Sequence, residues 1–544
     1  MGLRLIYGRA GTGKSEKCYK EISEKIKQNN KILIITPEQF SFTAEKKLME
    51  AIETEAVFNA EVVTFSRMAY RVIQEIGGRT ETNLSKCGKA MLIYSILNNC
   101  KKDLKFLGKT DENVDMAGTA ITEFKKHGIS VEQLKQETEK QSDIYLKNKL
   151  NDINMIYEKF QEQIAGKYID ETDLLTILAQ NVDKVPDFKD NLIYIDEFAG
   201  FTSQEYDIIQ KLVKIAKQVT ITICTDTIHE IKNADTDIFY SNQITINKLL
   251  QLASENDIKI EEVELEQTYR FKTPELKHLE QNLYNSKVKY FEQIPQNIKI
   301  FLAKNQYSEI EEVAKKIYKL VRDENYRYRD IAVITKNIDT YSSLARAIFD
   351  KYNIPIFIDE NRDLSQNILV QYVLSILEIF TKNWTEEAVL NYIKIGFSEI
   401  DEDDLFRLEK YCLKWGIKQN KWKKEFTYGN YEEKDKEEIA RLEEIRKQII
   451  EPLISLKNKL DENKTAEGIS RTIYNFLIEQ NIAEKIKQKQ EKLEEQGLID
   501  LSNEYQSSIQ TIIDILDEIV LVFKDDKITL DKYAQILKVG FKNS

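Results

Sequence analysis

Residues 3–15, LRLIYGRAGTGKS, contain the most informative pattern in the sequence. An apolar run at residues 3–7 leads directly into GRAGTGKS (8–15), which fits the phosphate-loop pattern GxxxxGK[ST]. A helical stretch follows over about residues 15–28, and KILIIT (31–36) has the composition of a buried strand. A strand, a glycine-rich loop, a helix and a second strand in this order predict the opening of a parallel α/β sheet.

The residue types of the loop suit the phosphate chain of a nucleotide. Glycines allow backbone N–H groups to surround an anion, Lys14 supplies a positive charge, and the Ser15 hydroxyl can bind Mg²⁺. The positive end of the following helix points at the same place. The predicted nucleotide-binding residues are Gly8, Arg9, Ala10, Gly11, Thr12, Gly13, Lys14 and Ser15. The alternative is a loop that keeps this shape without binding a nucleotide.

Two acidic residues and an arginine later in the chain could complete such a site. LIYI (192–195) is followed by Asp196 and Glu197. Because the carboxyl ends of parallel strands meet at one edge of a sheet, we expect Asp196 to hold Mg²⁺ together with Ser15, and Glu197 to orient or activate water. Arg270, within QTYRF, could stabilise charge on a transferring phosphoryl group. The alternatives are a structural carboxylate for Glu197 and an ordinary surface arginine for Arg270.

The remaining pattern divides the chain into sheet-forming and helical parts. A short strand is expected at 62–64, the stretch from about residue 84 to 169 is helical throughout, and the strand pattern then resumes at 192–195 and 219–224. A second α/β unit begins near residue 298. Its expected strands are 299–303, 331–335 and 354–358, and its expected helices are 309–322 and 342–351. Residues 385–538 are expected to be helical, and the charge-dense stretch 422–438 is expected to be a solvated loop.

Composition excludes several classes of protein. The 544 residues carry 79 basic and 91 acidic side chains, a net charge of −12, so a small module coated in positive charge is disfavoured. A local DNA-binding groove remains compatible with this average. No two of the five cysteines are closer than thirteen residues, which excludes zinc knuckles and CxxC redox motifs and favours a reducing, cytoplasmic location. We expect no membrane span and no secretory leader.

The motifs, taken in order, resemble those of superfamily 1 helicases. GRAGTGKS, YIDEF (194–198), CTDT (224–227) and QTYRF (267–271) look like motifs I to IV. ITPEQFSFTAE (35–45) and VTFSRMAY (63–70) stand where that superfamily places segments that contact single-stranded DNA. Longer strings, including TPEQFSFTAEKKL (36–48) and NLIYIDEFAGFTSQEY (191–206), look like the AddB family of subunits of AddAB helicase–nucleases.

This resemblance implies a fold and a set of domains. The expected fold is α/β: a RecA-like parallel-sheet domain with a phosphate loop, large helical insertions and a partial second RecA-like domain. The first RecA-like domain would comprise residues 1–80 and 166–295, with a helical insertion at 81–165. The partial second RecA-like domain would comprise 296–382, and a helical insertion domain 383–544.

The resemblance also implies an activity, cofactors and partners. Members are expected to resect double-strand DNA breaks for recombinational repair, using ATP and Mg²⁺ under the control of the Chi sequence. The implied partners are an AddA-type helicase/nuclease subunit and double- and single-stranded DNA. No interaction with a membrane is implied. Carried over by position, Lys14, Ser15, Asp196, Glu197 and Arg270 form the nucleotide site, and Thr36, Thr64, Phe65 and Arg67 contact a DNA strand. For Phe65 and Tyr70, packing in the core is the favoured alternative.

The sequence also departs from the family pattern. The family is expected to carry a C-terminal nuclease domain with a cysteine-bound iron–sulfur cluster, but no cysteine follows Cys412, so the nuclease and the C-terminal cluster ligands are expected to be absent here. The second α/β unit is expected to be incomplete and to lack the arginine that reaches the nucleotide from across the cleft. Two hypotheses therefore stay open: a helicase-like enzyme subunit, or a scaffold that binds DNA and a partner with nucleotide as a structural ligand. A small-molecule kinase is disfavoured, since it would not need two α/β units and large helical insertions.

Overall fold

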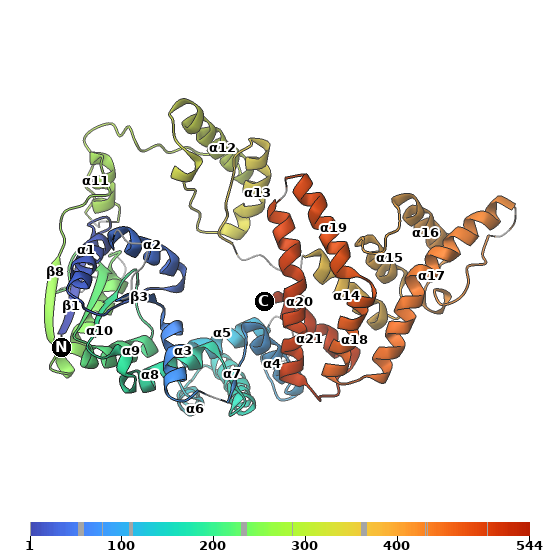
Figure 1. Cartoon of the computed structure of the whole chain (residues 1–544), viewed down its shortest axis with the longest axis horizontal. Coiled ribbons are helices and arrows are strands. Elements are labelled where there is room, and N and C mark those ends of the chain that lie inside the picture. The colour runs from blue at the N-terminus through green and yellow to red at the C-terminus, as the bar shows by residue number, and fades with distance from the viewer. Residues whose placement is uncertain are drawn as a thin grey trace.

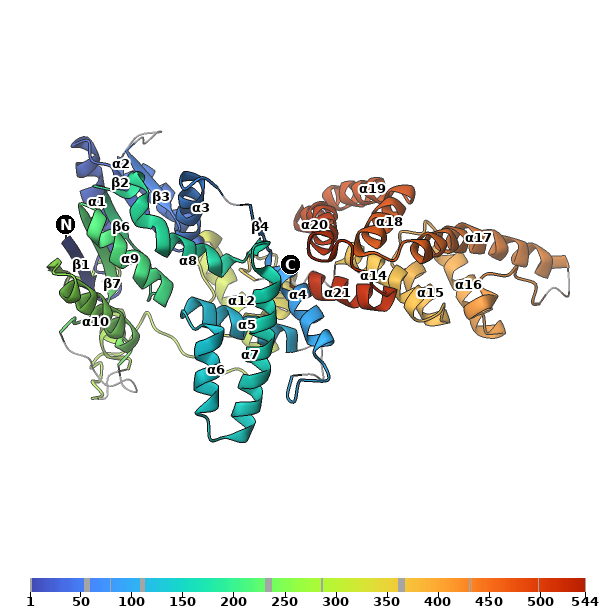
Figure 2. The same cartoon turned by 90° about the horizontal axis from the view of Figure 1, so that it is seen from below.

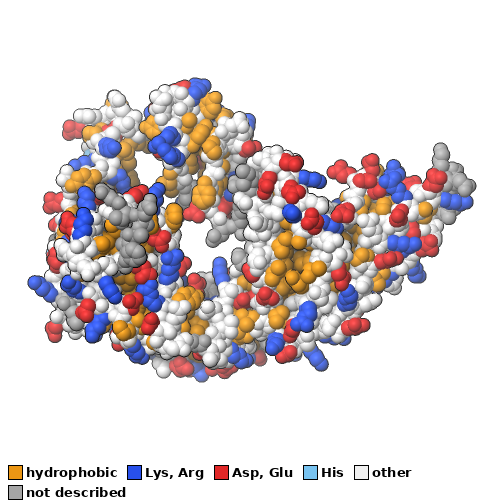
Figure 3. Space-filling model, in the orientation of Figure 1, with side chains coloured by type: hydrophobic (Ala, Val, Ile, Leu, Met, Phe, Trp, Pro, Cys, Tyr) orange, Lys and Arg blue, Asp and Glu red, His pale blue; other side chains and the backbone are white. Residues whose placement is uncertain are grey.

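The chain forms a parallel-sheet domain, a small two-helix unit and a large helical unit (Figure 1). The computed structural model describes residues 2–52, 59–78, 80–107, 113–229, 237–284, 287–360, 367–429, 431, 433–497 and 499–543. The three parts surround an opening that is visible in the space-filling view of Figure 3. None of the helices in the described ranges has the length and apolar character of a membrane span.

The sheet domain contains six strands in the order β3-β2-β6-β7-β1-β8, and every pairing is parallel. The strands are β1 (Gly2–Gly8), β2 (Ile32–Ile35), β3 (Ala60–Val63), β6 (Leu192–Ile195), β7 (Gln218–Cys224) and β8 (Lys259–Glu264). The first five of these in chain order were predicted, with bounds that differ by at most two residues. The predicted α/β fold with a parallel sheet and helical insertions is confirmed.

Helices cover both faces of this sheet, so its strands are apolar on both sides. On one face, α1 (Lys14–Lys27) and α2 (Ser41–Ile52) pack against Ile6, Ile34 and Tyr194. On the other face, α3 (Phe65–Glu75), α8 (Glu171–Asn181), α9 (Ser203–Ile215) and α10 (Tyr240–Glu255) pack against Leu5, Ile35 and Ile193. Successive residues of one strand thus belong to two different cores. This double burial holds the carboxyl ends of the strands in fixed positions.

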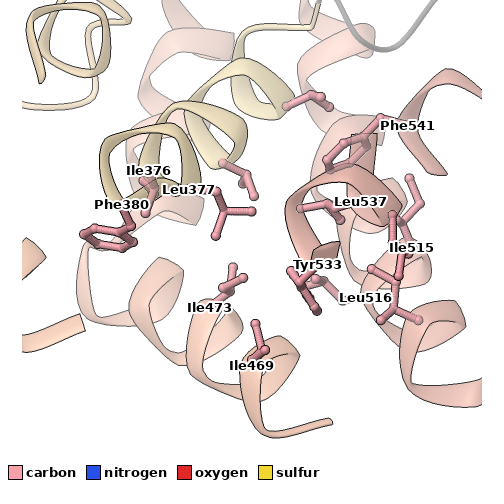
Figure 4. Close-up of a cluster of buried hydrophobic side chains, with 14 of the residues drawn as sticks. Ile376, Leu377, Phe380, Ile469, Ile473, Ile515, Leu516, Tyr533, Leu537 and Phe541 are labelled. Atoms are coloured by element: carbon pink, nitrogen blue, oxygen red, sulfur yellow. The ribbon is translucent and has the colours of Figure 1, made fainter. Parts of the chain in front are cut away.

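The helices inserted at two separate places in the chain form one body with one hydrophobic core. The first group comprises α4 (Lys86–Asn99), α5 (Asn113–Lys126), α6 (Val131–Glu139) and α7 (Ile144–Ile164). The second comprises α14 (Ile368–Thr381), α15 (Glu386–Lys394), α16 (Glu402–Trp415), α17 (Glu433–Glu462), α18 (Ala466–Glu479), α19 (Ile482–Glu495), α20 (Ile499–Phe523) and α21 (Leu530–Lys542). In Figure 2, α4 and α21 lie side by side. In Figure 4, four helices direct one labelled side chain each toward a common centre: Leu377 from α14, Ile473 from α18, Leu516 from α20 and Leu537 from α21. Helix α14 therefore packs with the helical unit, although the sequence-based boundary at residue 382 groups it with the second α/β unit.

A two-residue parallel ladder marks where the first insertion leaves and rejoins the sheet domain. Strand β4 (Thr82–Asn83) pairs with β5 (Tyr168–Ile169). The predicted helical span of 84–169 thus ends in a short strand that the sequence pattern did not reveal. The two ends of the insertion are thus bonded to each other where it meets the sheet domain, and α5 packs against α8 beside them.

The second α/β unit differs from its prediction. Its helices form as expected, as α12 (Gln306–Asp323) and α13 (Ile338–Lys351), but the predicted strands at 299–303, 331–335 and 354–358 are not bonded into a sheet. An apolar segment becomes a buried strand only when both of its faces are covered. Here the segments line a cavity of about 1120 Å³ together with the two helices, and Ile334 and Phe357, which belong to this lining, are 92% and 90% exposed.

The stretch 422–438 is also not the solvated loop that its charge predicted. The Trp422 side chain is fully buried, Phe426 is 3% exposed, and α17 begins at Glu433. The two aromatic side chains fix this stretch to the helical unit, while the charged residues between them point outward. The loop prediction was wrong because it rested on the many charged residues of this stretch and overlooked the two aromatic side chains that are buried.

Candidate nucleotide-binding site

The loop that joins β1 to α1 is held in its shape by three glycines. Gly11 and Gly13 have φ angles of 76° and 83°, which favour glycine. At Gly8 the constraint is space, because a Cβ there would lie 2.4 Å from the Leu265 carbonyl oxygen and 2.7 Å from the Thr12 hydroxyl. The Thr12 hydroxyl in turn donates to the Arg9 carbonyl at 3.0 Å. The loop therefore has one tightly packed backbone path.

Lys14 begins α1 and points back over this loop. Its ammonium group donates to the carbonyl oxygens of Gly8 at 2.8 Å and Arg9 at 3.0 Å. Burial lowers the pKa of Lys14 from its ordinary value, and the nearby Arg270 adds to this, whereas the carboxylates of Asp196 and Glu197 oppose it. A phosphate group at this place would replace two neutral carbonyl acceptors with an anion, which is the stronger partner for an ammonium group.

The two predicted acidic residues follow β6 at the same edge of the sheet. Asp196 is 4% exposed, and one of its carboxylate oxygens accepts a hydrogen bond from the Thr222 hydroxyl on the neighbouring β7. Glu197 has a positive φ of 66°, which turns its side chain toward α1. Its carboxylate accepts a hydrogen bond from the Ser15 hydroxyl at 3.3 Å and lies 3.5 Å from the Lys47 ammonium nitrogen. The structure therefore brings the loop and both acids together.

Arg270 also lies against the loop. The Tyr269 backbone N–H donates to the Gly11 carbonyl at 2.8 Å, and a Cβ on Gly11 would lie 2.5 Å from the Arg270 Cβ. The segment after β8 thus rests directly on the phosphate loop and carries an exposed guanidinium group beside it. No residue but glycine at position 11 would allow this approach without a shift.

Tyr269 is a site residue that the sequence analysis did not single out. Its ring is 63% exposed, and ring carbons lie 3.6 and 3.7 Å from the position of a Cβ on Gly13. A flat aromatic surface beside the phosphate loop is suited to cover the base or sugar of a bound nucleotide. The signal in the sequence was an aromatic residue next to Arg270, but only the structure shows that it faces the loop.

Arg9 has a role that the loop pattern did not predict. Its guanidinium group turns away from the anion site and donates to the Glu280 carboxylate at 3.0 Å and to the Glu280 carbonyl at 2.8 Å. It also lies 4.9 Å from the centre of the Phe239 ring. Arg9 therefore attaches α11 (Pro274–Asn282) to the phosphate loop.

The four predicted DNA-contacting residues lie in two different settings. Thr36 is 1% exposed and its hydroxyl has no hydrogen-bond partner among the described residues, whereas the Thr64 hydroxyl caps α3 by accepting from the Arg67 N–H at 3.2 Å. Phe65 is buried against Phe198, with ring centres 5.6 Å apart, which is the core packing that the sequence favoured for it. The Arg67 side chain is exposed and 3.4 Å from Glu45. Tyr70, for which core packing was also favoured, is 43% exposed, so that expectation is wrong.

The donor atoms at the loop suit Mg²⁺. The hydroxyl of Ser15 and the carboxylates of Asp196 and Glu197 are hard oxygen donors, and Mg²⁺ is usually held by one or two carboxylates together with phosphates and water. The iron–sulfur cluster that the family resemblance implies would need a cluster of cysteine ligands. Within the described ranges, no cluster of three or more His, Cys, Asp or Glu side chains is arranged to hold a metal ion.

Comparison with known families agrees with this geometry. The family model described as "ADDB, N-terminal" matches residues 5–280, which contain the phosphate loop, both acids and Arg270. The chain belongs to this family. The family membership predicted from the motifs is thereby confirmed.

Curated relatives extend the similarity to the whole chain. A protein of Clostridium novyi is 37% identical over all of this chain and 48% of its own length. A protein of Clostridium tetani is 39% identical over all of this chain and 49% of its own length, and one of Thermoanaerobacter sp. is 37% identical over the same shares. Each is named as the B subunit of an ATP-dependent helicase/deoxyribonuclease. The chain spans about half the length of these relatives.

Proposed function

We propose that this chain is the helicase-like half of an AddB-type subunit and binds ATP with Mg²⁺ at the loop of residues 8–15. The observation that carries the proposal is the meeting of Lys14, Ser15, Glu197 and Arg270 at one edge of a parallel sheet. These groups supply a cation for the phosphates, oxygen donors for Mg²⁺ and a second cation beside the loop. The names of the relatives, which include ATP dependence, support the same reading.

In this proposal each residue has a defined task. Lys14 exchanges the Gly8 and Arg9 carbonyls for phosphate oxygens. Asp196, with one oxygen held by Thr222, and Ser15 would hold Mg²⁺, which would neutralise charge on the phosphates. Glu197 orients the attacking water, and Arg270 stabilises negative charge as it develops.

The biological setting follows from the family. We propose that the chain acts with an AddA-type subunit on double- and single-stranded DNA, in the resection of broken ends for recombinational repair under the control of Chi. Thr36, Thr64 and Arg67 are the proposed strand-contacting residues. Arg67 is the best candidate, since its side chain is exposed, whereas Thr36 is 1% exposed and the Thr64 hydroxyl is already used as a helix cap.

A second function is favoured by one observation. The extended segments of the second α/β unit are not joined into a sheet, and the cations placed at the phosphate loop in the described residues, Lys14 and Arg270, belong to the first domain. A cation supplied from across the cleft accelerates phosphoryl transfer by several orders of magnitude. Without one, the chain would bind nucleotide as a structural ligand and serve as a scaffold for DNA and a partner.

One experiment separates the two functions. ATP hydrolysis by the chain is measured with and without single-stranded DNA, for the unaltered protein, Lys14→Ala and Glu197→Gln. The enzyme reading predicts turnover that DNA stimulates and that both substitutions abolish. Nucleotide binding without turnover in the unaltered chain would favour the scaffold, and turnover that survives Lys14→Ala would contradict the proposed site.

A further inference from the structure

Positive charge is concentrated in one short stretch of this acidic chain. Residues 407–424 contain seven basic residues and one acidic residue, in a protein of net charge −12. We call this stretch the basic turn; its cations are Arg407, Lys410, Lys414, Lys418, Lys421, Lys423 and Lys424. It begins within α16, which lies with α17 in the part of the helical unit farthest from the sheet (Figures 1 and 2). The basic turn is therefore well separated from the nucleotide site.

The cations of the basic turn are mostly exposed to solvent. Six of the seven are exposed and Lys421 is half-buried. Within the part of the chain that the structure describes, none of the seven forms an ion pair. The acid in the same stretch, Glu409, is already bound by Lys394 at 2.6 Å. Two nearby carboxylates have other partners, Asp404 in Arg441 and Glu443 in Arg446, while Asp403 and Glu425 flank the basic turn in the sequence.

The backbone that carries these cations is firmly anchored. Helix α16 ends at Trp415, its cap Gly416 has a φ of 58°, and the Ile417 N–H donates to the Cys412 carbonyl at 3.0 Å. The fully buried Trp422 accepts a hydrogen bond at its carbonyl from Arg446 at 3.0 Å. A fixed backbone lowers the entropic cost of binding a partner, since only the side-chain ends must be ordered.

The arrangement of the basic turn favours phosphate contacts over stacking on bases. Arg407, Lys410 and Lys414 follow at spacings of three and four, so they share one face of α16. The nearby aromatic rings of Trp415 and Tyr428 stack on each other, with centres 5.7 Å apart. Lys414 lies 5.1 Å from the Trp415 ring and Lys421 lies 5.2 Å from the Tyr428 ring. These rings are thus engaged with each other and with lysines.

We propose that the basic turn is a contact surface for the phosphate backbone of duplex DNA, separate from the nucleotide site. Duplex DNA has the higher charge density and so gains more from uncompensated cations than a single strand does. The inference rests on the proposed function in one respect, that the chain handles DNA. It does not require nucleotide binding or hydrolysis.

The test uses three cations whose side chains have no hydrogen bond or ring contact in the described structure. Lys410→Gln, Lys418→Gln and Lys424→Gln are combined in the full chain, and binding to fluorescent blunt duplex DNA of about four helical turns is measured by anisotropy without nucleotide over a series of salt concentrations. A matched control combines Lys27→Gln, Lys135→Gln and Lys189→Gln, which are exposed lysines elsewhere on the chain. A third variant replaces the same three cations of the basic turn with arginine. Thermal melting establishes that each variant folds.

The predicted loss is large and specific. Each lost phosphate contact lowers the slope of log K against log salt by about 0.9, so we expect the slope to fall by about 2 to 3 and the affinity at about 0.1 M salt to fall by about 10- to 100-fold. The control and the arginine variant should bind duplex as the unaltered chain does. A single-stranded probe of equal length should lose clearly less affinity.

Three results would overturn the inference. Equal slopes in the glutamine variant and the control would show that the basic turn does not contact DNA. Equal losses for duplex and single-stranded probes would contradict the assignment to duplex. An unchanged duplex affinity with weaker binding of an AddA-type subunit would assign the surface, with the exposed Phe406 and Leu413 beside it, to a protein partner. Because no nucleotide is present, failure here is distinguishable from failure of the ATP site.

Discussion

At the residue scale, Gly11 is where the phosphate loop depends most on the absence of a side chain. Two separate constraints act there: a positive φ of 76°, and a distance of only 2.5 Å between the place that a Cβ would occupy and the Arg270 Cβ. The loop pattern in the sequence does not require glycine at this position. Glycine is needed here because Arg270 lies against the loop, a contact that only the three-dimensional structure shows.

Gly11→Ala should therefore cost more than the backbone strain alone. We expect a loss of about 2 to 3 kcal/mol in stability together with weaker nucleotide binding, because Arg270 must move away from the loop. Gly128→Ala is the matched control, since Gly128 has a similar φ of 68° but no atom within 4 Å of a Cβ. Denaturant unfolding and nucleotide titration of both variants measure the difference. Equal losses in both would show that the contact with Arg270 is unimportant.

Sequence reasoning identified the chemistry of the site better than its supporting contacts. Lys14, Ser15, Asp196 and Glu197 were named because their residue types match known phosphate chemistry, and the structure places the loop beside both acids. The contacts of Tyr269 with Gly13 and of Arg9 with Glu280 join residues more than 250 positions apart. A local pattern carries no information about such pairs.

At the element scale, a buried group of charges joins the helical insertion to the sheet domain. Asp170 caps the start of α8 and accepts hydrogen bonds from Lys125 of α5 at 2.9 Å and Lys89 of α4 at 3.1 Å. Burial alone would raise the pKa of Asp170, but the two lysines more than offset this and hold that pKa well below its usual range. A group whose pKa is lowered on folding stabilises the protein above its unfolded pKa of about 4, and this contribution is lost as the pH falls.

Asp170→Asn should remove this contribution while keeping a residue that can cap α8. We expect a loss of about 3 kcal/mol at neutral pH, because two lysines lose their shared buried partner. The difference between the unaltered chain and the variant should stay constant above about pH 5 and shrink below about pH 4. Urea unfolding over this pH range is the measurement. A difference that does not shrink in acid would contradict the role of the Asp170 charge.

The elements themselves were predicted best where their surroundings are simple. Strands buried on both faces, such as β1 and β6, are continuous apolar runs and were found within one or two residues. The bounds of strand β8 were not predicted from the sequence. It is an edge strand, and four of its six residues are glutamate or lysine. The segments of the second α/β unit were predicted as strands from the same apolar pattern as β1, but that pattern cannot show whether a covering layer is present.

At the scale of the whole molecule, the structure divides differently from the sequence. The two helical insertions lie more than 200 residues apart, yet α4 shares one core with α14, α20 and α21. Figure 4 shows the side chains that α14, α20 and α21 contribute to this core. The helical character of both insertions is evident in their sequence patterns. Nothing in either pattern shows that each is buried against the other.

A shared core predicts that both insertions unfold together and separately from the sheet domain. Phe541→Ala removes a fully buried ring of α21 and should destabilise the helical unit by about 3 to 5 kcal/mol. In calorimetry we expect a lower melting temperature for the helical unit only, whereas ATP with Mg²⁺ should raise the transition of the sheet domain. Hydrogen exchange can follow the two insertions separately. If Phe541→Ala reduced the protection of α15–α18 but not that of α4–α7, the two insertions would be shown to unfold independently.

The proposed function depends above all on nucleotide binding through Lys14 at the loop of residues 8–15. The most direct test is the equilibrium binding of ATP with Mg²⁺ to the full chain by calorimetry, for the unaltered protein, Lys14→Ala and the control Lys20→Ala, which alters an exposed lysine on the same helix. We predict saturable one-to-one binding that Lys14→Ala weakens by about 100-fold, since a charge-assisted hydrogen bond contributes up to about 3 kcal/mol, and that Lys20→Ala leaves unchanged. No binding by the unaltered chain, or equal affinity in all three proteins, would contradict the claim.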